Sequence, residues 1–454
     1  MGEIRDPIYG FIEPSETELK IINTPLFQRL RKIKQLAMAY LVYPGANHTR
    51  FDHSLGVYHI ASLMAEKLLP GRENEEKRKI VRLSALLHDV GHGPFSHISE
   101  ELLDRYSYIS TNNEKEKIHE KITAMLIENN AELGTLLSFE DKKSIVGLLS
   151  GEKVDISLMK EIVSGPLDAD KMDYLLRDSY FCGVKYGVFD LHRMLNTLNF
   201  YEEDNDKHMA INYDGINSLE QFVLAKYYMT TQVYRHKIRC VSDSMIIRGL
   251  ELGIEKDEID FLNRLYRYKN TEGYINNYLD YWDERVINEI VFSEKSGFAK
   301  GFFKRLYNRQ LFKRIFSEKL KDIEIMDEKT KDRIINITSK ENEELRKEIE
   351  KEIASLKPLQ CKKEEVIVNS FTIKSVKEMS RNSEGEIIVI DKKGNKRSFE
   401  DESTVFNSID ESMRDMYFEV YAPLEYVDRK DKRKKLMVIR DGILEILKDI
   451  KGAV

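Results

Sequence analysis

Cysteine is scarce in this sequence. The 454 residues include three, Cys182, Cys240 and Cys361, which lie far apart and in no metal-like spacing. Such thiols cannot form a disulfide framework and are typical of a reducing compartment. Long apolar runs are also missing: no segment approaches the roughly 20 residues of a membrane-spanning helix, and the first residues lack the apolar stretch of a secretory signal. We therefore expect a cytoplasmic protein with no part in a membrane.

A strong excess of one charge is lacking as well. The 72 basic residues face 78 acidic ones, so the net charge is -6. This balance argues against a uniformly basic nucleic-acid binder. The local basic run 429–435 leaves room for a nucleic-acid partner, which we do not expect. Hydrophobic residues make up 41% of the chain, which is enough for a sizeable core.

Apolar residues at helical spacing predict helices over most of the first 357 residues. The first begins at Pro25, with Thr24 as its N-cap. Further helices are expected at 53–69, 77–90, 117–150, 157–181 and 217–250, and the highly charged stretch 257–357 is expected to remain helical. Beyond Pro358, strands are expected at 365–368, 386–391, 396–399 and 416–421, followed by an amphipathic helix at 436–450.

The fold class that follows is mainly α. We expect a helical core over residues 1–250, a helical extension over 251–357 and a small α+β lobe over 358–454.

The segment 86–97 carries the densest group of metal-ligating side chains. His88 and Asp89 end a helix that is apolar nearly all round, and two more histidines follow. Ionisable groups at the inner end of a buried helix usually have partners. A lone His-Asp pair is more often structural than catalytic, but this chain supplies two further candidates, His53 and Asp170.

We therefore expect His53, His88, Asp89 and Asp170 to hold a divalent metal ion. Two imidazoles and two carboxylates leave coordination positions for substrate oxygens and water, as a catalytic ion requires. This ligand set suits Mn, Fe, Ni, Co or Zn better than Ca, and Mg is an alternative working ion.

The order of these four residues resembles the signature of the HD-domain metal-dependent phosphohydrolases. Further blocks are similar to the dNTP triphosphohydrolase branch, and more narrowly to the SAM-and-HD-domain dNTPases and their bacterial relatives. These blocks are Phe27–Leu36, Pro44–Ala46, Arg50–Val57, His88–His97 and Asp170–Asp178. The resemblance covers residues 4–250. It implies an HD-domain helical core that removes the whole triphosphate from a dNTP and leaves a deoxynucleoside.

The resemblance also implies roles for residues around the ion. His92 and His119 would lie over the α-phosphate as catalytic groups, with His97 nearby. The residues implied to bind phosphate or sugar are Gln35, Arg50, Lys171, Tyr174, Asp178, Lys226, Tyr234, His236 and Lys237. A His that donates a proton to the leaving oxygen makes cleavage feasible near neutral pH. The histidines expected to be structural are His48, His59, His192 and His208.

The chain departs from the mammalian-type relatives at an activating nucleotide site. Gln28 and Arg31 match, but Asn23 stands where those relatives carry an Asp that reads guanine. Lys226 stands where they carry an Arg for the substrate triphosphate, so the charge is kept and the bidentate fork is lost. The resemblance thus implies a nucleotide-activated homotetramer or homodimer, with a dNTP effector favoured over GTP.

Two alternatives are left open by these residues. One is a different HD phosphohydrolase, such as a phosphodiesterase, a pyrophosphatase or a (p)ppGpp hydrolase, because the metal ligands alone do not separate these activities. The other is a nucleotide-sensing or nucleic-acid-binding regulator with a weak site. The intact set of four ligands favours an enzyme over a regulator.

Overall fold

The computed structural model divides into two compact units that interleave along the chain. The first unit comprises Met1–Val233, Asp260–Asn288 and Val376–Asp410, and the second comprises Tyr234–Ile259, Glu289–Ser375 and Glu411–Val454. The described residues are 2–107, 118–150, 157–269, 271–323, 328–359, 361–382, 385–408 and 415–450. The boundaries predicted after residues 250 and 357 do not separate these units.

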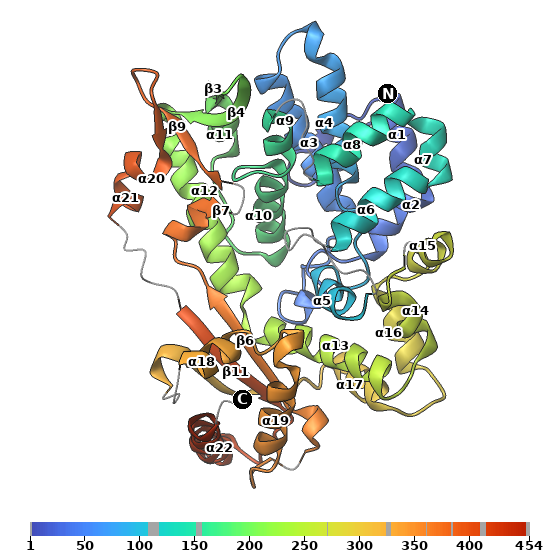
Figure 1. The fold of residues 1–454 in the computed structure, drawn as a ribbon, viewed down its shortest axis with the longest axis vertical. Coiled ribbons are helices and arrows are strands. Elements are labelled where there is room, and N and C mark those ends of the chain that lie inside the picture. Colours follow the sequence, from blue (N-terminus) through green and yellow to red (C-terminus); the bar gives the residue numbers. More distant parts are fainter. Residues whose placement is uncertain are drawn as a thin grey trace. The chain divides into compact units, whose positions relative to one another are not determined.

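Helices dominate both units (Figure 1), which confirms the predicted fold class, mainly α with a small α+β part. The first unit contains α1 (Glu16–Ile22), α2 (Pro25–Gln28), α3 (Arg50–Leu68), α4 (Glu75–Leu87), α5 (His97–Tyr106), α6 (Ile118–Asn129), α7 (Ala131–Leu136), α8 (Phe139–Ser150), α9 (Ser157–Val163), α10 (Ala169–Cys182), α11 (Leu191–Thr197), α12 (Ile216–Tyr228), α14 (Asp260–Tyr266), α15 (Glu272–Leu279), α20 (Phe399–Glu402) and α21 (Thr404–Asn407). The second contains α13 (Lys237–Glu255), α17 (Phe298–Tyr307), α18 (Glu328–Ile335), α19 (Glu343–Ala354) and α22 (Arg429–Asp449), and α16 (Asp283–Val291) begins in the first unit and ends in the second.

Short strands form small sheets in each unit. The first unit has β1 (Ile4–Asp6), β2 (Gly10–Ile12), β3 (Leu198–Glu203), β4 (Asp206–Asn212), β7 (Arg381–Asn382), β8 (Gly385–Glu386), β9 (Ile388–Ile390) and β10 (Lys396–Ser398). The second has β5 (Lys313–Lys319), β6 (Ile367–Ile373) and β11 (Asp415–Ala422). β4 pairs in parallel with β9, and β11 pairs antiparallel with both β5 and β6. Because these partners are distant in sequence, each unit needs several separate parts of the chain.

The strands predicted beyond Pro358 agree with the structure, but strands earlier in the chain were not predicted. β6, β11 and the β9–β10 hairpin confirm the expected strands. The expectation that 257–357 is entirely helical is wrong, because β5 lies within it. The charged residues at both ends of β5 are typical of a solvated helix in the sequence. In the structure, β5 is a strand because it pairs with β11. The β3–β4 hairpin was not anticipated.

Several helix boundaries also differ from the prediction. Thr24 caps α2 as expected, but the regular helix ends at Gln28 and continues as a 3-10 turn. The helix expected at 217–250 is not regular throughout: α12 ends at Tyr228, Met229–Tyr234 forms a π-helix, and α13 begins at Lys237. The helix expected at 436 begins at Arg429, so the basic run forms its first turns.

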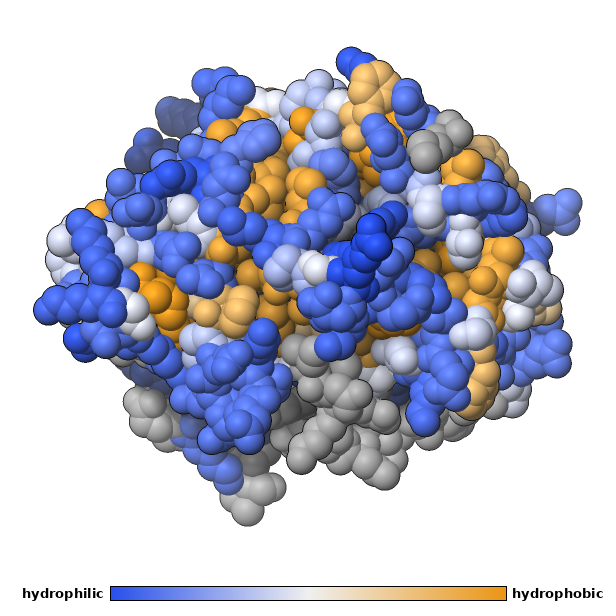
Figure 2. Space-filling model, turned by 90° about the horizontal axis from the view of Figure 1, so that it is seen from above, coloured by the Kyte–Doolittle hydropathy of each residue, from blue (hydrophilic) through white to orange (hydrophobic). Residues whose placement is uncertain are grey.

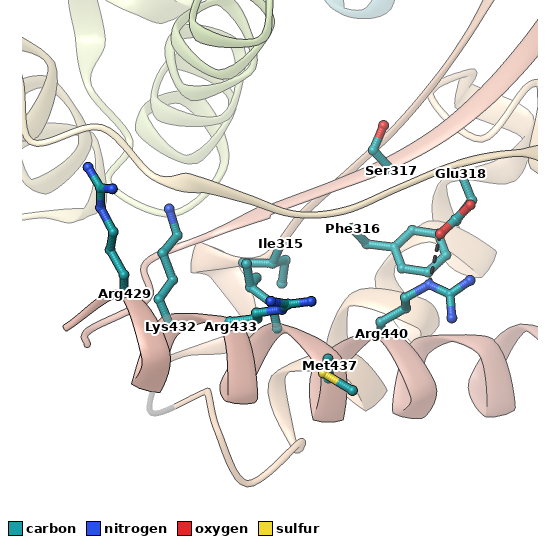
Figure 3. A pocket seen from close by; sticks show the side chains of 10 residues that line it. Ile315, Phe316, Ser317, Glu318, Arg429, Lys432, Arg433, Met437 and Arg440 are labelled. Atoms are coloured by element: carbon teal, nitrogen blue, oxygen red, sulfur yellow. Dashed lines mark hydrogen bonds and ion pairs between the residues drawn. The ribbon is translucent and has the colours of Figure 1, made fainter. Parts of the chain in front are cut away.

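The basic run of α22 lines a cavity of about 510 Å³ in the second unit (Figure 3). Ile315 and Phe316 of β5 and Met437 of α22 form its apolar lining. The lining also includes Arg429, Lys432, Arg433 and Arg440, of which Arg440 is 2.8 Å from Glu318. On the face shown in Figure 2, hydrophilic residues surround smaller apolar patches.

Helix α3 occupies the centre of the first unit and packs against α4 and α10 (Figure 1). A capping box starts it, because Thr49 and Asp52 hydrogen-bond to each other over the first turn. Because of this cap, α3 begins at Arg50 and not at the predicted His53. The side chains of Arg50 and His53 therefore both lie in the first turn of the helix. α4 ends at Leu87, and His88 and Asp89 follow immediately at its buried end.

The turn between α4 and α5 is held in an unusual conformation by Asp283. Phe95 and Ser96 both have positive φ values, 64° and 54°, which costs about 1–3 kcal/mol for each non-glycine residue. Asp283 accepts hydrogen bonds from the backbone N–H of Phe95 (2.7 Å) and of Lys34 (3.0 Å). Arg29 donates to the carbonyl of His92 at 2.8 Å. These contacts fix the histidine-bearing turn.

We predict that Asp283→Ala loosens this turn. Two buried backbone donors would lose their acceptor, which costs about 2–4 kcal/mol in total. Urea unfolding followed by circular dichroism measures this loss. The matched control is Asp280→Ala, an exposed residue one turn earlier, which we expect to change stability by less than about 0.5 kcal/mol. Equal stability of Asp283→Ala and the wild type would contradict the assignment.

Candidate metal and catalytic site

The four predicted metal ligands converge at one point in the first unit. His53 Nε2 lies 3.0 Å from Asp170 Oδ1 and 3.7 Å from Asp89 Oδ2. His88 Nε2 lies 3.2 Å from Asp89 Oδ1 and 4.0 Å from Asp170 Oδ1. α3, the end of α4 and α10 therefore contribute to one cluster, within which His53, His88 and Asp89 are close enough to share an ion.

The orientation of the two imidazoles fits a metal ion. His53 Nδ1 donates to Asp173 at 2.8 Å, and His88 Nδ1 donates to the carbonyl of Ala85 at 2.8 Å. In each ring the buried Nε2 then makes no hydrogen bond to any described residue. A neutral imidazole that donates through Nδ1 presents its Nε2 lone pair, which is the arrangement of metal-bound histidine.

The electrostatics of the cluster favour a bound cation. Burial alone would lower the pKa of His53, but the contacts with Asp170 and Asp173 raise it to about 10. Burial would raise the pKa of Asp89, but the charges of Arg50, His88 and His92 lower it well below its usual range. The carboxylates are thus ionised, and the cluster stabilises a positive charge at His53 Nε2, whether a proton or a metal ion.

A second cluster gathers the three other predicted histidines around Glu100 of α5. Glu100 oxygens lie 3.2 Å from His92 Nδ1, 2.8 Å from His97 Nδ1 and 3.0 Å from His119 Nδ1. The rings of His92 and His119 are stacked at 4.3 Å. His92 Nε2 lies 3.1 Å from Asp89 Oδ1, which links this cluster to the metal ligands.

These histidines have different protonation preferences. Burial and the charge of His92 lower the pKa of His119 to about 4. Burial and Arg50 would lower the pKa of His92 too, but Asp89 and Glu100 outweigh them and raise it above its ordinary value. Environments that separate the pKa values of adjacent groups are typical of an acid and a base in one active site. His92 is therefore suited to carry a proton, while His119 stays neutral.

Both clusters border one cavity of about 1300 Å³. The predicted residues that line it are Gln35, Arg50, His88, Asp89, His92, His97, His119, Asp170, Lys171 and Tyr174. Arg50 donates to Asp89 (2.7 Å) and to Ser96 (2.9 Å), while its buried Nη2 has no partner among the described residues. Gln35 Oε1 is likewise buried without a partner in that part of the chain.

Other predicted residues lie elsewhere. Among the described residues lining the cavity, neither Asp178 nor Lys226 occurs. Asp178 contacts buried His48 at 2.8 Å, and Lys226 Nζ donates to the carbonyl of Met379 at 3.1 Å. The predicted phosphate-binding residues Tyr234, His236 and Lys237 belong to the second unit, and their part in the site stays a prediction.

The residues predicted to bind an effector lie near one another, around α1 and α2. Gln28 Nε2 donates to the carbonyl of Ile22 at 2.8 Å, and Arg31 Nε donates to Gln28 Oε1 at 2.8 Å. Asn23 is exposed at the end of α1. Their part in binding a nucleotide also stays a prediction.

Two residues of the site were missed in the sequence. Glu100 lies one helical turn after His97, and this spacing is the signal that could have found it. Asp173 lies three residues after Asp170, so both carboxylates face α3. Asp173 lies within the block Asp170–Asp178, and Glu100 follows the block His88–His97. Most of the side chains that these two residues contact, however, belong to other parts of the chain.

Comparison with known proteins identifies the class of this fold and site. Residues 50–178 match the HD domain, and residues 189–441, more than half of the chain, match the HD associated region. The chain belongs to the HD-domain family with an HD associated region, as the resemblance predicted. Its likeness to phosphohydrolases of this family supports a hydrolase that uses a divalent metal ion.

Individual relatives include proteins of archaea, bacteria and vertebrates. An uncharacterized protein of Methanocaldococcus jannaschii is 39% identical over 57% of this chain and 51% of its own length. The human deoxynucleoside triphosphate triphosphohydrolase SAMHD1 is 31% identical over 69% of this chain and 54% of its own. The chain thus spans about half the length of these two curated relatives.

A solved structure is similar over nearly the whole chain. This protein from Aquifex aeolicus is 31% identical, with a TM-score of 0.69, over 97% of this chain and 100% of its own. Among the described residues, no helix combines the length and the apolar character needed to cross a bilayer.

We predict that Glu100→Gln moves the pH dependence of turnover as well as its rate. Removing this carboxylate charge lowers the pKa of His92, so His92 loses its proton at lower pH and the alkaline limb of the profile shifts toward acid. We expect the rate to fall by about 10–100-fold, which is less than the roughly 10²–10⁴-fold contribution of a complete general acid, because His92 itself is retained. Initial rates of phosphate-ester hydrolysis between pH 5.5 and 9.5 measure the position of the alkaline limb and the fall in turnover.

The control for this experiment is Glu101→Gln on the same helix. Glu101 is adjacent to Glu100 on α5 and forms an ion pair with Arg105 at 3.2 Å, so we expect a wild-type profile. A Glu100→Gln enzyme with a reduced rate and an unshifted alkaline limb would contradict the role of Glu100 in holding a proton on His92.

Proposed function

We propose that this protein is a metal-dependent dNTP triphosphohydrolase. The observation that carries the proposal is the cavity beside the metal cluster and the stacked His92–His119 pair. Arg50 Nη2 and Gln35 Oε1 are buried there without a hydrogen-bond partner among the described residues. A cation, an amide and two histidines beside a divalent ion match what a nucleoside polyphosphate presents: negative charge, hydroxyl groups and a leaving oxygen. The similarity to SAMHD1 supports the deoxynucleotide as substrate.

The residues would divide the reaction between them. A divalent ion held by His53, His88, Asp89 and Asp170 would activate water or polarise a phosphate oxygen. Arg50 and Lys171 would bind phosphate oxygens, which lowers the cost of bringing a tetraanion into the cavity. Gln35 and Tyr174 would orient the sugar. His92, whose pKa is raised by Asp89 and Glu100, would donate its proton to the leaving oxygen.

The proposal extends to regulation and assembly. Gln28, Arg31 and Asn23 would take part in binding a nucleotide effector, for which a dNTP is favoured over GTP. Lys226, Tyr234, His236 and Lys237 would bind phosphate oxygens, as the resemblance to the dNTP triphosphohydrolases implies. We propose a cytoplasmic homotetramer or homodimer, as the sequence resemblance to the dNTP triphosphohydrolases implies.

The product of the reaction distinguishes this proposal from other HD phosphohydrolases. We expect each dNTP, or mixtures of dNTPs that supply an effector, to yield a deoxynucleoside and intact inorganic triphosphate in the presence of Mn²⁺ or Mg²⁺. Reversed-phase and anion-exchange chromatography resolve these products. Asp89→Ala, which removes a metal ligand and the partner of Arg50, should reduce the rate to background.

Other products would redirect the assignment. Release of pyrophosphate or single phosphates would contradict the triphosphohydrolase and indicate another HD phosphohydrolase. A metal-loaded protein that binds nucleotides with no turnover of any mixture would instead support a nucleotide-sensing regulator.

A further inference from the structure

The metal ligand His53 is connected to the N-terminus of the chain by buried polar contacts. Its Nδ1 donates to Asp173 Oδ2, which also accepts from Arg177 Nε at 2.9 Å. The other oxygen of Asp173 accepts from Arg177 Nη2 at 3.0 Å and from the hydroxyl of Tyr9 at 2.7 Å. Each oxygen of this fully buried carboxylate thus has two donors, and one donor is the metal ligand itself.

The β1–β2 hairpin supplies the far end of these contacts. Asp6 Oδ2 accepts from Arg177 Nη1 at 2.9 Å, while Asp6 Oδ1 accepts from the backbone N–H groups of Ile8 and Tyr9, at 2.8 and 3.0 Å. The same carboxylate therefore closes the hairpin turn and holds the arginine. The Tyr9 ring also stacks on His59 of α3 at 5.0 Å.

Helix α3 leaves a space for this arrangement at Gly56. A Cβ atom on Gly56 would lie 1.9 Å from Asp173 Oδ1 and 2.4 Å from Arg177 Nη2. His53, Gly56 and His59 follow one another at three-residue intervals, so they share a face of α3. This face accepts the ion pair directly behind the metal ligand, where a side chain would displace it.

The charges of these groups do not balance by themselves. Asp6 and Asp173 carry two negative charges against the single positive charge of Arg177, and all three side chains are at most 6% exposed. A buried ion pair contributes little net stability, and an uncompensated buried charge is costly. A cation at His53 Nε2 compensates the excess negative charge through the imidazole.

We infer that the β1–β2 hairpin, through Asp6 and Tyr9, positions His53 and sets the affinity of the metal site. Tyr9 and Asp6 are positioning residues, because they act on the ion through Asp173, Arg177 and His53. A segment at the start of the chain would then control how tightly the centre holds its ion. The inference rests on the metal centre of the proposed function but not on the identity of the substrate.

The test is the affinity of Tyr9→Phe for Mn²⁺, measured by competition with a fluorescent chelator at fixed pH. Loss of a group that holds a metal-bound histidine typically costs about 10–100-fold in metal affinity. Tyr9 is one contact further from the ion, so we expect about a tenfold loss for Tyr9→Phe and about a 100-fold loss for Asp173→Asn. Asp6→Asn should weaken binding in the same direction while it keeps the turn.

The first unit offers a matched control in Tyr58. Its hydroxyl donates to Glu18 at 2.8 Å, and Arg82 contacts both Glu18 and Tyr58 at 2.6 Å. Tyr58→Phe therefore removes a hydroxyl from a similar tyrosine–carboxylate–arginine group, whose carboxylate binds Tyr58 and Arg82 instead of a candidate metal ligand. We expect Tyr58→Phe to alter thermal stability but leave Mn²⁺ affinity at the wild-type value.

The possible results separate this inference from the proposed function. Wild-type affinity in Tyr9→Phe, or an equal loss in Tyr9→Phe and Tyr58→Phe, would overturn it. A wild-type protein that binds no Mn²⁺ would overturn both the metal centre and the inference. Tight Mn²⁺ binding that weakens selectively in Tyr9→Phe, without any dNTP hydrolysis, would support the inference and refute the proposed substrate.

Discussion

The hydrogen bond from His53 Nδ1 to Asp173 is the contact on which the site depends. It fixes the tautomer of a fully buried imidazole, so that Nε2 faces Asp89 and Asp170. Asp170 and Asp173 are three residues apart on α10, and α10 therefore supplies both the partner behind His53 and the carboxylate in front of it. Packing of α3 against α10 is thus sufficient to build half of the metal cluster.

The two clusters divide the chemistry according to their charge. Around His53, the carboxylates of Asp89, Asp170 and Asp173 favour a permanent cation. Around Glu100, three imidazoles share one carboxylate. This cluster can therefore hold a proton that is exchanged during the reaction, and it does not need a permanently bound cation. Asp89 belongs to both clusters because it contacts His88 and His92. A change in charge at the ion is therefore felt directly by the proton on His92.

The sequence indicated the candidate metal ligands more directly than the residues that support them. His53, His88, Asp89 and Asp170 are recognisable because their order and neighbouring blocks are specific to a family. Glu100 has no such motif, and its role arises only when α5 and α6 bring three histidines to it. The residues that hold the site from afar depend on tertiary packing: Asp283 lies in a stretch predicted as a helical extension, and Tyr9 lies in a short hairpin.

Prediction of the fold was limited in the same way, because features that depend on tertiary packing were not visible in the sequence. Helices with regular apolar spacing were predicted in the right places, and capping signals such as Thr24 were correct. β5 was missed because a strand rich in charge is stabilised by its neighbour β11 and not by its own sequence. The interruption between α12 and α13 falls where the apolar pattern continues, so spacing alone does not reveal it. Strand pairing between distant segments also explains why each of the two compact units is built from separate stretches of the chain.

Rigid and strained elements carry different parts of the site. The metal ligands come from α3, α10 and the end of α4, where helix packing restricts movement. His92 and His97 flank a turn in which Phe95 and Ser96 have positive φ, and this turn is kept in place by Asp283, Arg29 and neighbouring groups. A strained turn held by separate contacts is less stable than packed helices. Perturbation of those contacts should therefore impair proton transfer before it impairs metal binding, so the two properties are separable in one protein.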